Sequence, residues 1–387
     1  MQDLLITNAR AVLSGKIRPA ALWLSNGKIK QIFTEEVPLP NCPAFDAKGA
    51  LAVPGFIDLH IHGFAGHGPE NANPADLLAM SDELARYGVC AFCPTLYCAR
   101  PHEMETLLKK LLPALGSETG AKIIGFHLEG PFISPQKPGV MKPQDIVPPQ
   151  LDDMKRLYEA AQGHITNITL APELPGIGPI IDFCLARGIL IQAGHTNATY
   201  GDFLHGVQQG IKHTTHLFNA MSGFNHRNPG AAGAVLMHPE ISCEIIADGV
   251  HVHPDVVGFL RHIKPLENIV AVTDALKPTG LTSGPFVANG EDVILDGGVW
   301  KRKTDKVIAG SALTMAQAFK NLVKFGYSPA EAAQLTSTNA AQLTSTNAAH
   351  LLNIPLKGRL EEGFEADIVL LDEQLNLQAV FLGGKKQ

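Results

Sequence analysis

Eight short apolar runs, separated by longer segments with helix signals, constrain the fold of this chain more than any other feature. A strand that is covered on both faces is apolar throughout its length, and strands that alternate with helices are typical of a parallel sheet. The pattern therefore predicts an α/β fold with eight parallel strands. The runs span residues 51–60, 89–95, 123–129, 165–171, 189–194, 213–217, 242–247 and 269–273.

Eight such strands can close into a (β/α)8 barrel or form an open, doubly wound sheet. A dinucleotide-binding doubly wound fold carries a G-x-G-x-x-G motif after its first strand, and no such motif follows the first run. The intervening segments have helix signals, since Asn73-Pro74 supplies a cap and a first residue, and Gly88 and Gly188 follow helix-like stretches. We therefore expect a TIM-type barrel over residues 51–358.

The two ends of the chain have a different pattern, in which short apolar runs alternate with turn signals. LLITNARAVL and AALWLSNGKIKQIF near the N-terminus, with the turn pair Asn26-Gly27, indicate β-hairpins. GRLEEGFEADIVLLD and LNLQAVFLGGKK near the C-terminus have a similar pattern. We expect residues 1–50 and 359–387 to pair into one small β-sandwich domain beside the barrel.

The charge and the hydropathy exclude several classes of function. The net charge of −6 and the pI near 6.2 disfavour binding to nucleic acid, and an anionic substrate would have to be held by a few placed groups. The N-terminal MQDLLITNARAVL has an early acid and no long apolar stretch, and no segment reaches the length of a membrane span. The sequence therefore predicts a cytoplasmic protein that does not bind membranes.

The six cysteines form no regular framework, which argues against a disulfide scaffold. Cys90 and Cys93 have C-x-x-C spacing inside an apolar run, where a strand would point the two thiols to opposite faces. We interpret both as small buried side chains, with a redox or metal role as the alternative.

The octapeptide AAQLTSTN occurs twice in tandem, at residues 332–339 and 340–347. One extra copy lengthens a helix by about 12 Å at the α-helical rise. We expect the duplication to lie in a surface helix or loop, where it affects local packing more than chemistry.

Histidines and carboxylates stand at the carboxyl ends of the predicted strands. Singly, such a histidine is more often a structural group and such an aspartate a helix cap, but six at successive strand ends indicate a shared site. In a barrel these ends meet at one rim, where active sites of this fold lie, and converging imidazoles and carboxylates suit a zinc- or iron-class ion. The predicted metal and catalytic centre comprises His60, His62, Glu129, His195, His216 and Asp274.

Several motifs resemble a known family. PGFIDLHIHG, which contains His60 and His62, resembles the opening signature of the amidohydrolase superfamily. HLEGPF, AGHTNA, THLFNAM, IADGVHV, VTDA and AGSALTM together resemble its N-acetylglucosamine-6-phosphate deacetylase branch, over essentially the whole chain. Other amidohydrolases commonly bridge two metals with a carboxylated lysine on a barrel strand. The matching candidate here is Glu129, which argues against a dihydroorotase or a hydantoinase.

The resemblance implies a set of metal ligands and a general base. Glu129, His195 and His216 would bind the principal divalent metal, zinc or iron in the first place, with manganese or cobalt as alternatives. Asp274 would be the general base and acid. Some family members lack the His-x-His pair and use one metal. This sequence keeps His60 and His62, so it has ligands for a second ion, bridged by Glu129 and touching Asp274, and one or two ions per subunit are expected.

The resemblance also implies a substrate, an amino sugar phosphate, and its contacts. Such an enzyme removes the acetyl group from N-acetylglucosamine 6-phosphate to give glucosamine 6-phosphate and acetate. The catalytic His251 matches the residue that contacts the acetyl carbonyl. In many relatives the neighbouring subunit completes the phosphate site, so a homodimer is expected. Asn219, Ala220 and Arg227 match positions that hold the sugar phosphate, and Met141, Ile308, Ala309 and Gly310 complete the expected substrate site.

The sequence departs from the family after HLEGP, where the usual Lys-Gly-Ala-His is replaced by KPGVM at residues 137–141. Met141 takes the place of a histidine that reaches the substrate, and methionine cannot donate a hydrogen bond. Asn225 and His226 also vary the usual His-His pair. The galactosamine epimer is therefore an alternative substrate.

Two more distant alternatives have weaker support. One is an N-acyl amino acid or cyclic-amide hydrolase, against which Arg227 and THLFNAM argue. The other is a catalytically dead barrel that serves in assembly. Such a protein would have lost ligands, and none of the expected ligands is missing here.

Overall fold

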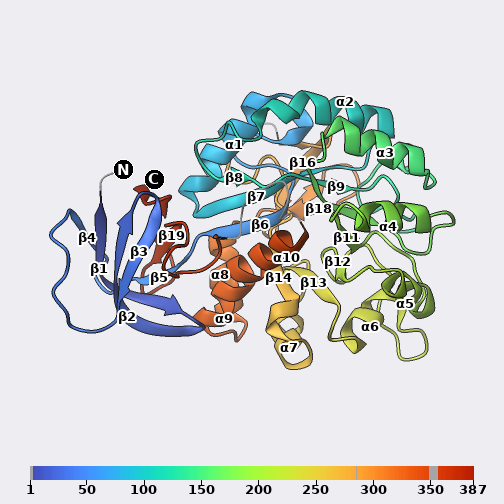
Figure 1. Cartoon of the computed structure of the whole chain (residues 1–387). Helices are drawn as coiled ribbons and strands as arrows, with labels where there is room; N and C mark the ends of the chain where they lie inside the picture. The colour runs from blue at the N-terminus through green and yellow to red at the C-terminus, as the bar shows by residue number, and fades with distance from the viewer. Residues whose placement is uncertain (1–2, 285, 348–355) are drawn as a thin grey trace.

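The computed structural model describes residues 3–284, 286–347 and 356–387, and its largest part is a parallel barrel (Figure 1). The barrel strands follow one another in chain order, each hydrogen-bonded in parallel to the next. Every predicted run contributes one of them, so the predicted (β/α)8 fold is confirmed. The strands are β6 (Phe56–Ile61), β7 (Val89–Leu96), β9 (Phe126–Glu129), β10 (Ile165–Leu170), β11 (Leu190–Ala193), β12 (His213–Thr214), β13 (Ser242–Ile246) and β14 (Ile269–Val272), with β8 (Lys122–Ile123) paired to β7.

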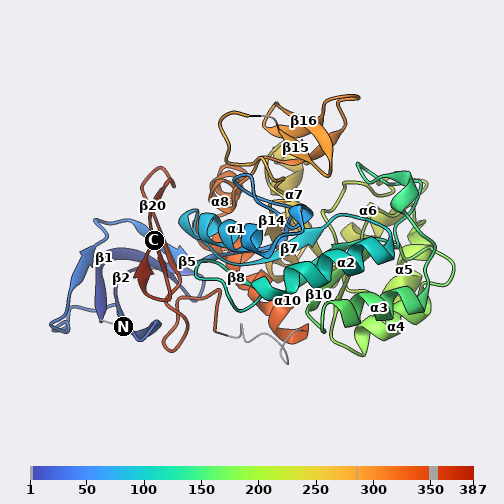
Figure 2. The same ribbon diagram turned by 90° about the horizontal axis from the view of Figure 1, so that it is seen from above.

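Helices follow the barrel strands and surround the barrel (Figures 1 and 2). The first begins at Pro74, and the side chain of Asn73 caps it by accepting a hydrogen bond from Ala75 N at 3.1 Å, as the sequence predicts. No helix in the described ranges is both long enough and apolar enough to cross a bilayer. The helices are α1 (Pro74–Arg86), α2 (Pro101–Leu111), α3 (Leu151–Ala160), α4 (Gly178–Leu185), α5 (Tyr200–Gln208), α6 (Gly230–Met237), α7 (Pro254–Ile263) and α8 (Met315–Lys324).

The barrel closes where its last strand meets its first. Asp274 N donates to His60 O at 2.9 Å, just beyond the end of β14. Asp58 fastens the same seam, because its carboxylate accepts hydrogen bonds from Thr273 N at 3.2 Å and from Thr273 Oγ1 at 2.6 Å. The seam therefore sets His60, His62 and Asp274 next to one another.

The two chain ends form one sheet beside the barrel, on the left in Figure 1 together with both termini. β1 pairs with β2 and β5, and β5 pairs with β19, which joins the two ends of the chain. The expected small β domain from both chain ends is thus present, while its limits at residues 50 and 359 stay a prediction. The strands are β1 (Leu4–Leu13), β2 (Lys16–Ser25), β3 (Lys28–Phe33), β4 (Ala44–Asp46), β5 (Leu51–Pro54), β19 (Ile368–Leu371), β20 (Leu377–Leu382) and β21 (Lys385–Lys386).

The predicted run 51–60 is divided between two sheets. β5 belongs to the terminal sheet and β6 opens the barrel, with Gly55 between them. A Cβ atom at Gly55 would lie 2.7 Å from Cys90 Cβ, so no side chain fits where the chain passes from one sheet to the other. The apolar pattern did not reveal this division, because both strands are buried along their whole length.

A small antiparallel sheet, which the sequence did not predict, stands between β14 and α8. Trp300 anchors it, since the residue is 1% exposed and its indole Nε1 donates to Thr279 Oγ1 at 2.9 Å. Figure 2 shows this sheet standing out from the barrel at the top. Its strands are β15 (Val287–Ala288), β16 (Glu291–Asp296), β17 (Val299–Arg302) and β18 (Ile308–Ser311).

The first copy of the duplicated octapeptide lies inside the molecule, where a surface position was expected. α9 (Pro329–Ala333) leads into a π-helical turn, η5 (Gln334–Thr338), in which Ser337 is buried. Asn339 Nδ2 donates to two backbone carbonyls at the start of β14 and just before it, at 2.7 and 2.6 Å. The second copy continues as α10 (Asn339–Asn347).

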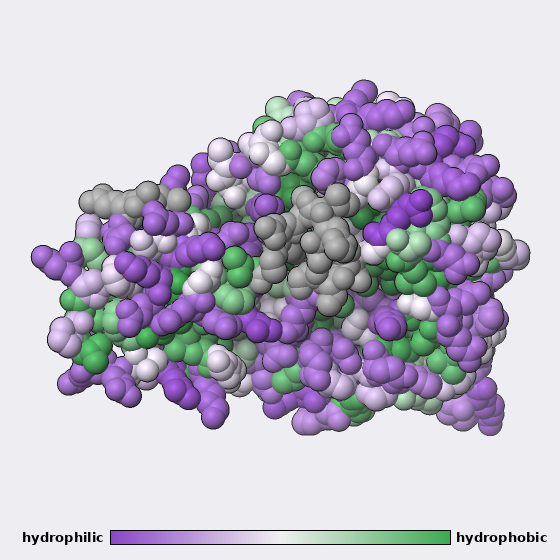
Figure 3. Space-filling model, viewed as in Figure 1, coloured by the Kyte–Doolittle hydropathy of each residue, from purple (hydrophilic) through white to green (hydrophobic). Residues whose placement is uncertain are grey.

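Apolar side chains fill the barrel wall and the inner faces of the helices, whereas hydrophilic residues cover much of the face seen in Figure 3. Cys90 and Cys93 belong to this interior as free thiols, and burial raises the pKa of both. Both are therefore packing residues, as expected.

Candidate metal and catalytic centre

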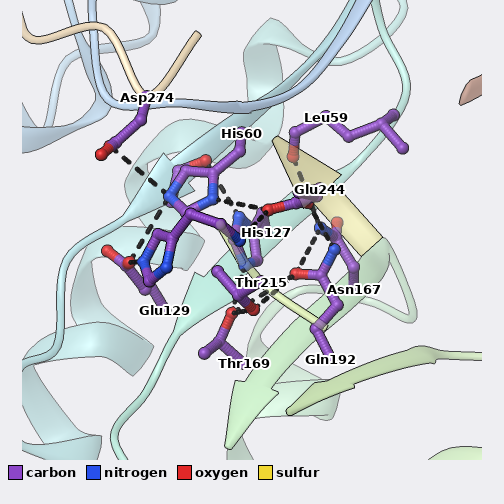
Figure 4. A network of polar contacts seen from close by, with 12 residues as sticks. Leu59, His60, His127, Glu129, Asn167, Thr169, Gln192, Thr215, Glu244 and Asp274 are labelled. Atoms are coloured by element: carbon purple, nitrogen blue, oxygen red, sulfur yellow. Dashed lines mark hydrogen bonds and ion pairs between the residues drawn. The ribbon is translucent and has the colours of Figure 1, made fainter. Parts of the chain in front are cut away.

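The six predicted residues of the centre lie together at the carboxyl ends of the barrel strands. Figure 4 shows three of them, His60, Glu129 and Asp274. Glu129 is the last residue of β9, while His195, His216 and Asp274 each lie two residues beyond the end of a strand. None of the six is more than 9% exposed. The strand ends thus bring distant parts of the sequence into one buried polar cluster.

Glu129 is the middle of this cluster. Its Oε1 lies 3.0 Å from His195 Nε2 and 3.1 Å from His216 Nε2. Its Oε2 lies 3.1 Å from His62 Nε2. The two oxygens of one carboxylate therefore face different imidazoles, which is the arrangement of a bridging ligand.

His60 and Asp274 complete the side of the cluster next to His62. His60 Nε2 lies 3.5 Å from Glu129 Oε1 and 3.7 Å from Asp274 Oδ1. His62 Nε2 lies 3.4 Å from the same oxygen of Asp274. Asp274 is thus within reach of both imidazoles of the His-x-His pair.

The donor set fits a divalent metal ion. Two groups, His60 with His62 and Asp274, and His60 with Glu129 and His216, each have ligand atoms within 4.8 Å of one another. His60 Nε2 is buried and has no hydrogen-bond partner among the described residues. An unpaired buried polar atom costs roughly 1–3 kcal/mol, which a bound cation would offset. Imidazole nitrogens with carboxylate oxygens suit zinc, iron, manganese or cobalt.

The charges in the cluster also favour a cation. Burial alone would raise the pKa of Glu129, but His60 and His195 hold this pKa well below its usual range. Burial alone would lower the pKa of His60, and Glu129 and Glu244 raise it well above its usual value. These shifts favour an ionised carboxylate at Glu129 with positive charge beside it, which a divalent cation would supply.

Three of the six residues have backbone conformations that are rare for non-glycine residues. The φ angles of His195, His216 and Asp274 are 46°, 27° and 51°. Each such residue costs on the order of 1–3 kcal/mol and persists where its surroundings fix it. For His216, one of the fixing contacts is the hydrogen bond that its backbone N donates to Glu244 Oε2 at 3.2 Å. These backbone conformations direct the three side chains toward the rim of the barrel.

His251 approaches the centre from the loop after β13. Its Nδ1 lies 2.6 Å from Asp248 Oδ2, and Asp248 Oδ1 accepts hydrogen bonds from the backbone of Val250 and of His251, both at 2.8 Å. Burial lowers the pKa of His251, but Asp248 outweighs burial, so the pKa is raised. The pair therefore favours a protonated imidazolium that can donate from Nε2.

A cavity of about 160 Å³ opens at the centre. Tyr97 and Val140, which the sequence did not single out, also line it. The predicted substrate residues that line it are Met141, Asn219, Ala220, His251, Ile308, Ala309 and Gly310.

Arg227 is the predicted substrate residue that the structure does not bring to the cavity. It is exposed, and its backbone N donates to Asn225 Oδ1 at 2.9 Å in the loop before α6. Phe224 in the same loop is 55% exposed, and Met237 at the end of α6 is 52% exposed. The loop before α6 therefore exposes both the arginine and an apolar side chain, Phe224.

Two residues next to the centre, Tyr97 and Glu244, were not predicted from the sequence. The ring of Tyr97 stacks on His62, with centroids 3.8 Å apart and planes 6° from parallel. Glu244 is fully buried inside the barrel and contacts His60. A charged residue in the middle of the apolar run 242–247 was a signal for the second. Tyr97 lies two residues beyond the run 89–95 and was not distinguishable from a core aromatic.

A parallel eight-stranded barrel with imidazoles and carboxylates gathered at the carboxyl ends of its strands defines the class of barrel hydrolases to which the amidohydrolases belong. The model of the amidohydrolase family matches residues 51–386, and the chain belongs to this family. Within the family it falls in the branch of the N-acetylglucosamine-6-phosphate deacetylases.

The relatives in this branch match essentially the whole chain. The N-acetylglucosamine-6-phosphate deacetylase of Lysinibacillus sphaericus is 30% identical over 387 residues, covering 99% of this chain and 97% of the relative. The N-acetylgalactosamine-6-phosphate deacetylase of Escherichia coli O157:H7 is 30% identical over 385 residues, covering 98% of both. The structure of a mutant N-acetyl-D-glucosamine-6-phosphate deacetylase from Mycobacterium smegmatis, in complex with N-acetyl-D-glucosamine-6-phosphate, aligns with a TM-score of 0.91 at 27% identity, covering 100% and 99%.

Proposed function

We propose that this protein hydrolyses the N-acetyl group of N-acetylglucosamine 6-phosphate, giving glucosamine 6-phosphate and acetate. The observation that carries the proposal is the position of Glu129, whose two carboxylate oxygens lie within 3.1 Å of three imidazoles beside the cavity. The substrate class is supported by relatives described above that are deacetylases of N-acetylglucosamine 6-phosphate. We also propose a cytoplasmic location, because sugar phosphates are metabolised there.

We propose Glu129, His195 and His216 as the ligands of the principal divalent ion. His60, His62 and Asp274 would hold a second ion, with Glu129 as the bridge. Zinc or iron is the first choice, and manganese or cobalt would also suit the ligands. The separate orientation of Oε1 and Oε2 of Glu129 supports the bridging role.

The proposed chemistry divides the work between the ion and two side chains. A bound divalent ion lowers the pKa of water toward neutrality and polarises an amide carbonyl. Asp274 takes the proton of the attacking water and delivers it to the departing amine. His251, held protonated by Asp248, donates a hydrogen bond from Nε2 to the developing oxyanion.

The remaining cavity residues would recognise the sugar phosphate. Asn219 and Ala220 follow His216 on the same loop, and β18 brings Ile308, Ala309 and Gly310 to the cavity wall. Arg227 is exposed and outside the cavity of its own chain, so we propose that it binds phosphate across a homodimer interface. A guanidinium binds phosphate through two parallel hydrogen bonds and would reject an unphosphorylated sugar.

The N-acetylgalactosamine 6-phosphate reaction is the second candidate. It is favoured by Met141, which is 3% exposed in the cavity wall and cannot donate a hydrogen bond to a sugar hydroxyl. The N-acetylgalactosamine-6-phosphate deacetylase of Escherichia coli O157:H7 is 30% identical to this chain, as is the N-acetylglucosamine-6-phosphate deacetylase of Lysinibacillus sphaericus.

Acetate release from three substrates tests the proposal. The substrates are the two 6-phosphorylated epimers and unphosphorylated N-acetylglucosamine, with the metal content measured on the same sample. We expect turnover of N-acetylglucosamine 6-phosphate and little of the unphosphorylated sugar. A metal-loaded protein that is inactive on both phosphorylated epimers would rule the proposal out, and a preference for the galacto epimer would select the second candidate.

A further inference from the structure

Glu244 is a buried carboxylate that the proposed reaction does not use directly. It lies in the middle of β13 (Ser242–Ile246), and the residue is 0% exposed. It does not line the cavity, so it does not touch the substrate. A carboxylate in such a place is costly unless fixed donors surround it. Its partners therefore indicate what it does.

The donors around Glu244 come from three other barrel strands or the loops that follow them. Figure 4 shows two of the donors, His60 and Gln192. Its Oε2 lies 3.1 Å from His60 Nδ1 and accepts a hydrogen bond from His216 N at 3.2 Å. Its Oε1 accepts a hydrogen bond from Gln192 Nε2 at 2.6 Å. One carboxylate oxygen thus contacts two residues of the candidate metal centre.

The contact with His60 sets the position of a proton. An ionised carboxylate can only accept hydrogen bonds, so Nδ1 of His60 carries the hydrogen that it donates. In a neutral imidazole the other nitrogen then keeps its lone pair. That nitrogen, Nε2, is the buried atom that faces Glu129 and Asp274 and has no hydrogen-bond partner in the part of the chain that the structure describes.

The contact with His216 fixes a backbone conformation. His216 has a φ of 27°, which needs surrounding structure to hold it. His216 lies two residues beyond β12. Its backbone N–H donates a hydrogen bond to Glu244 Oε2, and its side-chain Nε2 lies 3.1 Å from Glu129 Oε1. The same carboxylate therefore orients ligands on both sides of Glu129.

We propose that Glu244 is a positioning residue of the metal centre, which holds the Nδ1–H tautomer of His60 and the backbone of His216 so that both imidazoles present Nε2 to the ions. The inference rests on the proposed function only in that the centre binds metal. Gln192 supports Glu244, since its own Oε1 accepts a hydrogen bond from Thr169 Oγ1 at 3.3 Å. Partners of this kind in metal sites typically contribute 10–100-fold in metal affinity.

The test uses the full-length protein stripped of metal and needs no substrate. Zinc affinity is measured by chelator competition for the wild type, Glu244→Gln and Glu244→Leu. The His60 tautomer is measured by nitrogen NMR of histidine-labelled apoprotein, at a pH above the raised pKa of His60 so that the ring is neutral. We expect Glu244→Leu to weaken zinc binding by about 10–100-fold and to remove the Nδ1–H signal of His60. Glu244→Gln keeps one acceptor oxygen, so it should restore part of both.

The control is Asp367→Asn, which alters another buried carboxylate, paired with Lys357 beside β19 and away from the centre. It should lower the unfolding temperature without changing zinc affinity. Wild-type zinc affinity and an unchanged His60 signal in Glu244→Leu would overturn the proposal. Equal weakening in all three variants would also overturn it, because lost stability would then explain the effect. If Glu244→Leu does not fold, the zinc affinity of Glu244→Gln is compared with that of Asp367→Asn, and equal affinities overturn the proposal. None of these readouts depends on deacetylation.

Discussion

Asp274 is the residue on which the proposed chemistry depends most directly. Its carboxylate lies 3.4 Å from His62 Nε2 at the cavity wall, while three other residues can still hold the principal ion. Asp274→Asn removes a proton acceptor of the same shape, so kcat should fall by about 10²–10⁴-fold with little change in KM. Steady-state kinetics with metal analysis measure this. Near-native turnover would show that another group is the base, and Asp202→Asn, in a helix cap, is the control.

The Asp248–His251 pair predicts the alkaline limb of the pH profile. Nδ1 of His251 is engaged by Asp248, so donation to the oxyanion from Nε2 requires the protonated ring. Because the pKa of His251 is raised, the protonated form persists above the usual pKa and activity is lost as the pH rises through the raised value. Asp248→Asn removes the charge that raises this pKa, so the limb of kcat/KM should move to lower pH. An unmoved limb would remove His251 from the proposed role.

The candidate centre was predictable where its residues stand at the ends of apolar runs. His195, His216 and Asp274 each interrupt the pattern just beyond a strand, where hydrophobic burial does not explain a polar residue. Tyr97 was not predictable, because an aromatic ring after an apolar run has the same pattern whether it packs on a core residue or on His62. The exposed position of Arg227 depends on the path of a loop, which no periodicity encodes.

At the scale of elements, the barrel was predictable because its buried strands are apolar along their whole length, as β7 and β10 illustrate. Strand β12 has only two residues, and its run was recognised by its place in the series. The sheet of β15–β18 was missed, since β16 alternates burial weakly and carries three charged residues among six. Its position is determined by Trp300, whose indole enters the core next to Thr279.

The duplicated octapeptide gives a prediction for α9, η5 and α10. Deleting residues 332–339 or 340–347 yields the same protein, and in it Asn339 is still followed by two alanines. The contacts of Asn339 with the start of β14 and of Ser337 with Pro54 O are therefore retained. We expect activity and metal content to stay at wild-type values, with an unfolding temperature at least as high. A fall in unfolding temperature would show that the second copy contributes to the fold.

At the scale of the whole molecule, the terminal sheet and the barrel are packed through buried groups. Lys357 is 7% exposed and pairs with Asp367 at 2.5 Å, which in turn accepts a hydrogen bond from Gly383 N at 2.8 Å. A buried ion pair that loses one partner costs roughly 3–5 kcal/mol. The terminal sheet with β19 and helix α6, which the Arg227 loop precedes, lie at opposite ends of the molecule in Figure 1. Assembly and the internal domain contact can therefore be tested separately.

The surface around Arg227 predicts an active site shared between two subunits. Arg227 is exposed outside its own cavity, and Phe224 in the same loop is more than half exposed and provides apolar contact area. In a two-fold dimer each subunit would supply its arginine to the other. Arg227→Ala and Asp274→Asn should each be nearly inactive on the phosphorylated substrate.

When these two inactive variants are mixed and their subunits exchange, each mixed dimer contains one site with an intact Asp274 and an intact Arg227 from the other chain. Random exchange should restore about a quarter of the wild-type sites. Acetate release after exchange measures this, and fluorescently labelled subunits verify that exchange occurred. A mixture that exchanges fully and stays inactive would place the arginine in its own subunit's site or outside the reaction altogether.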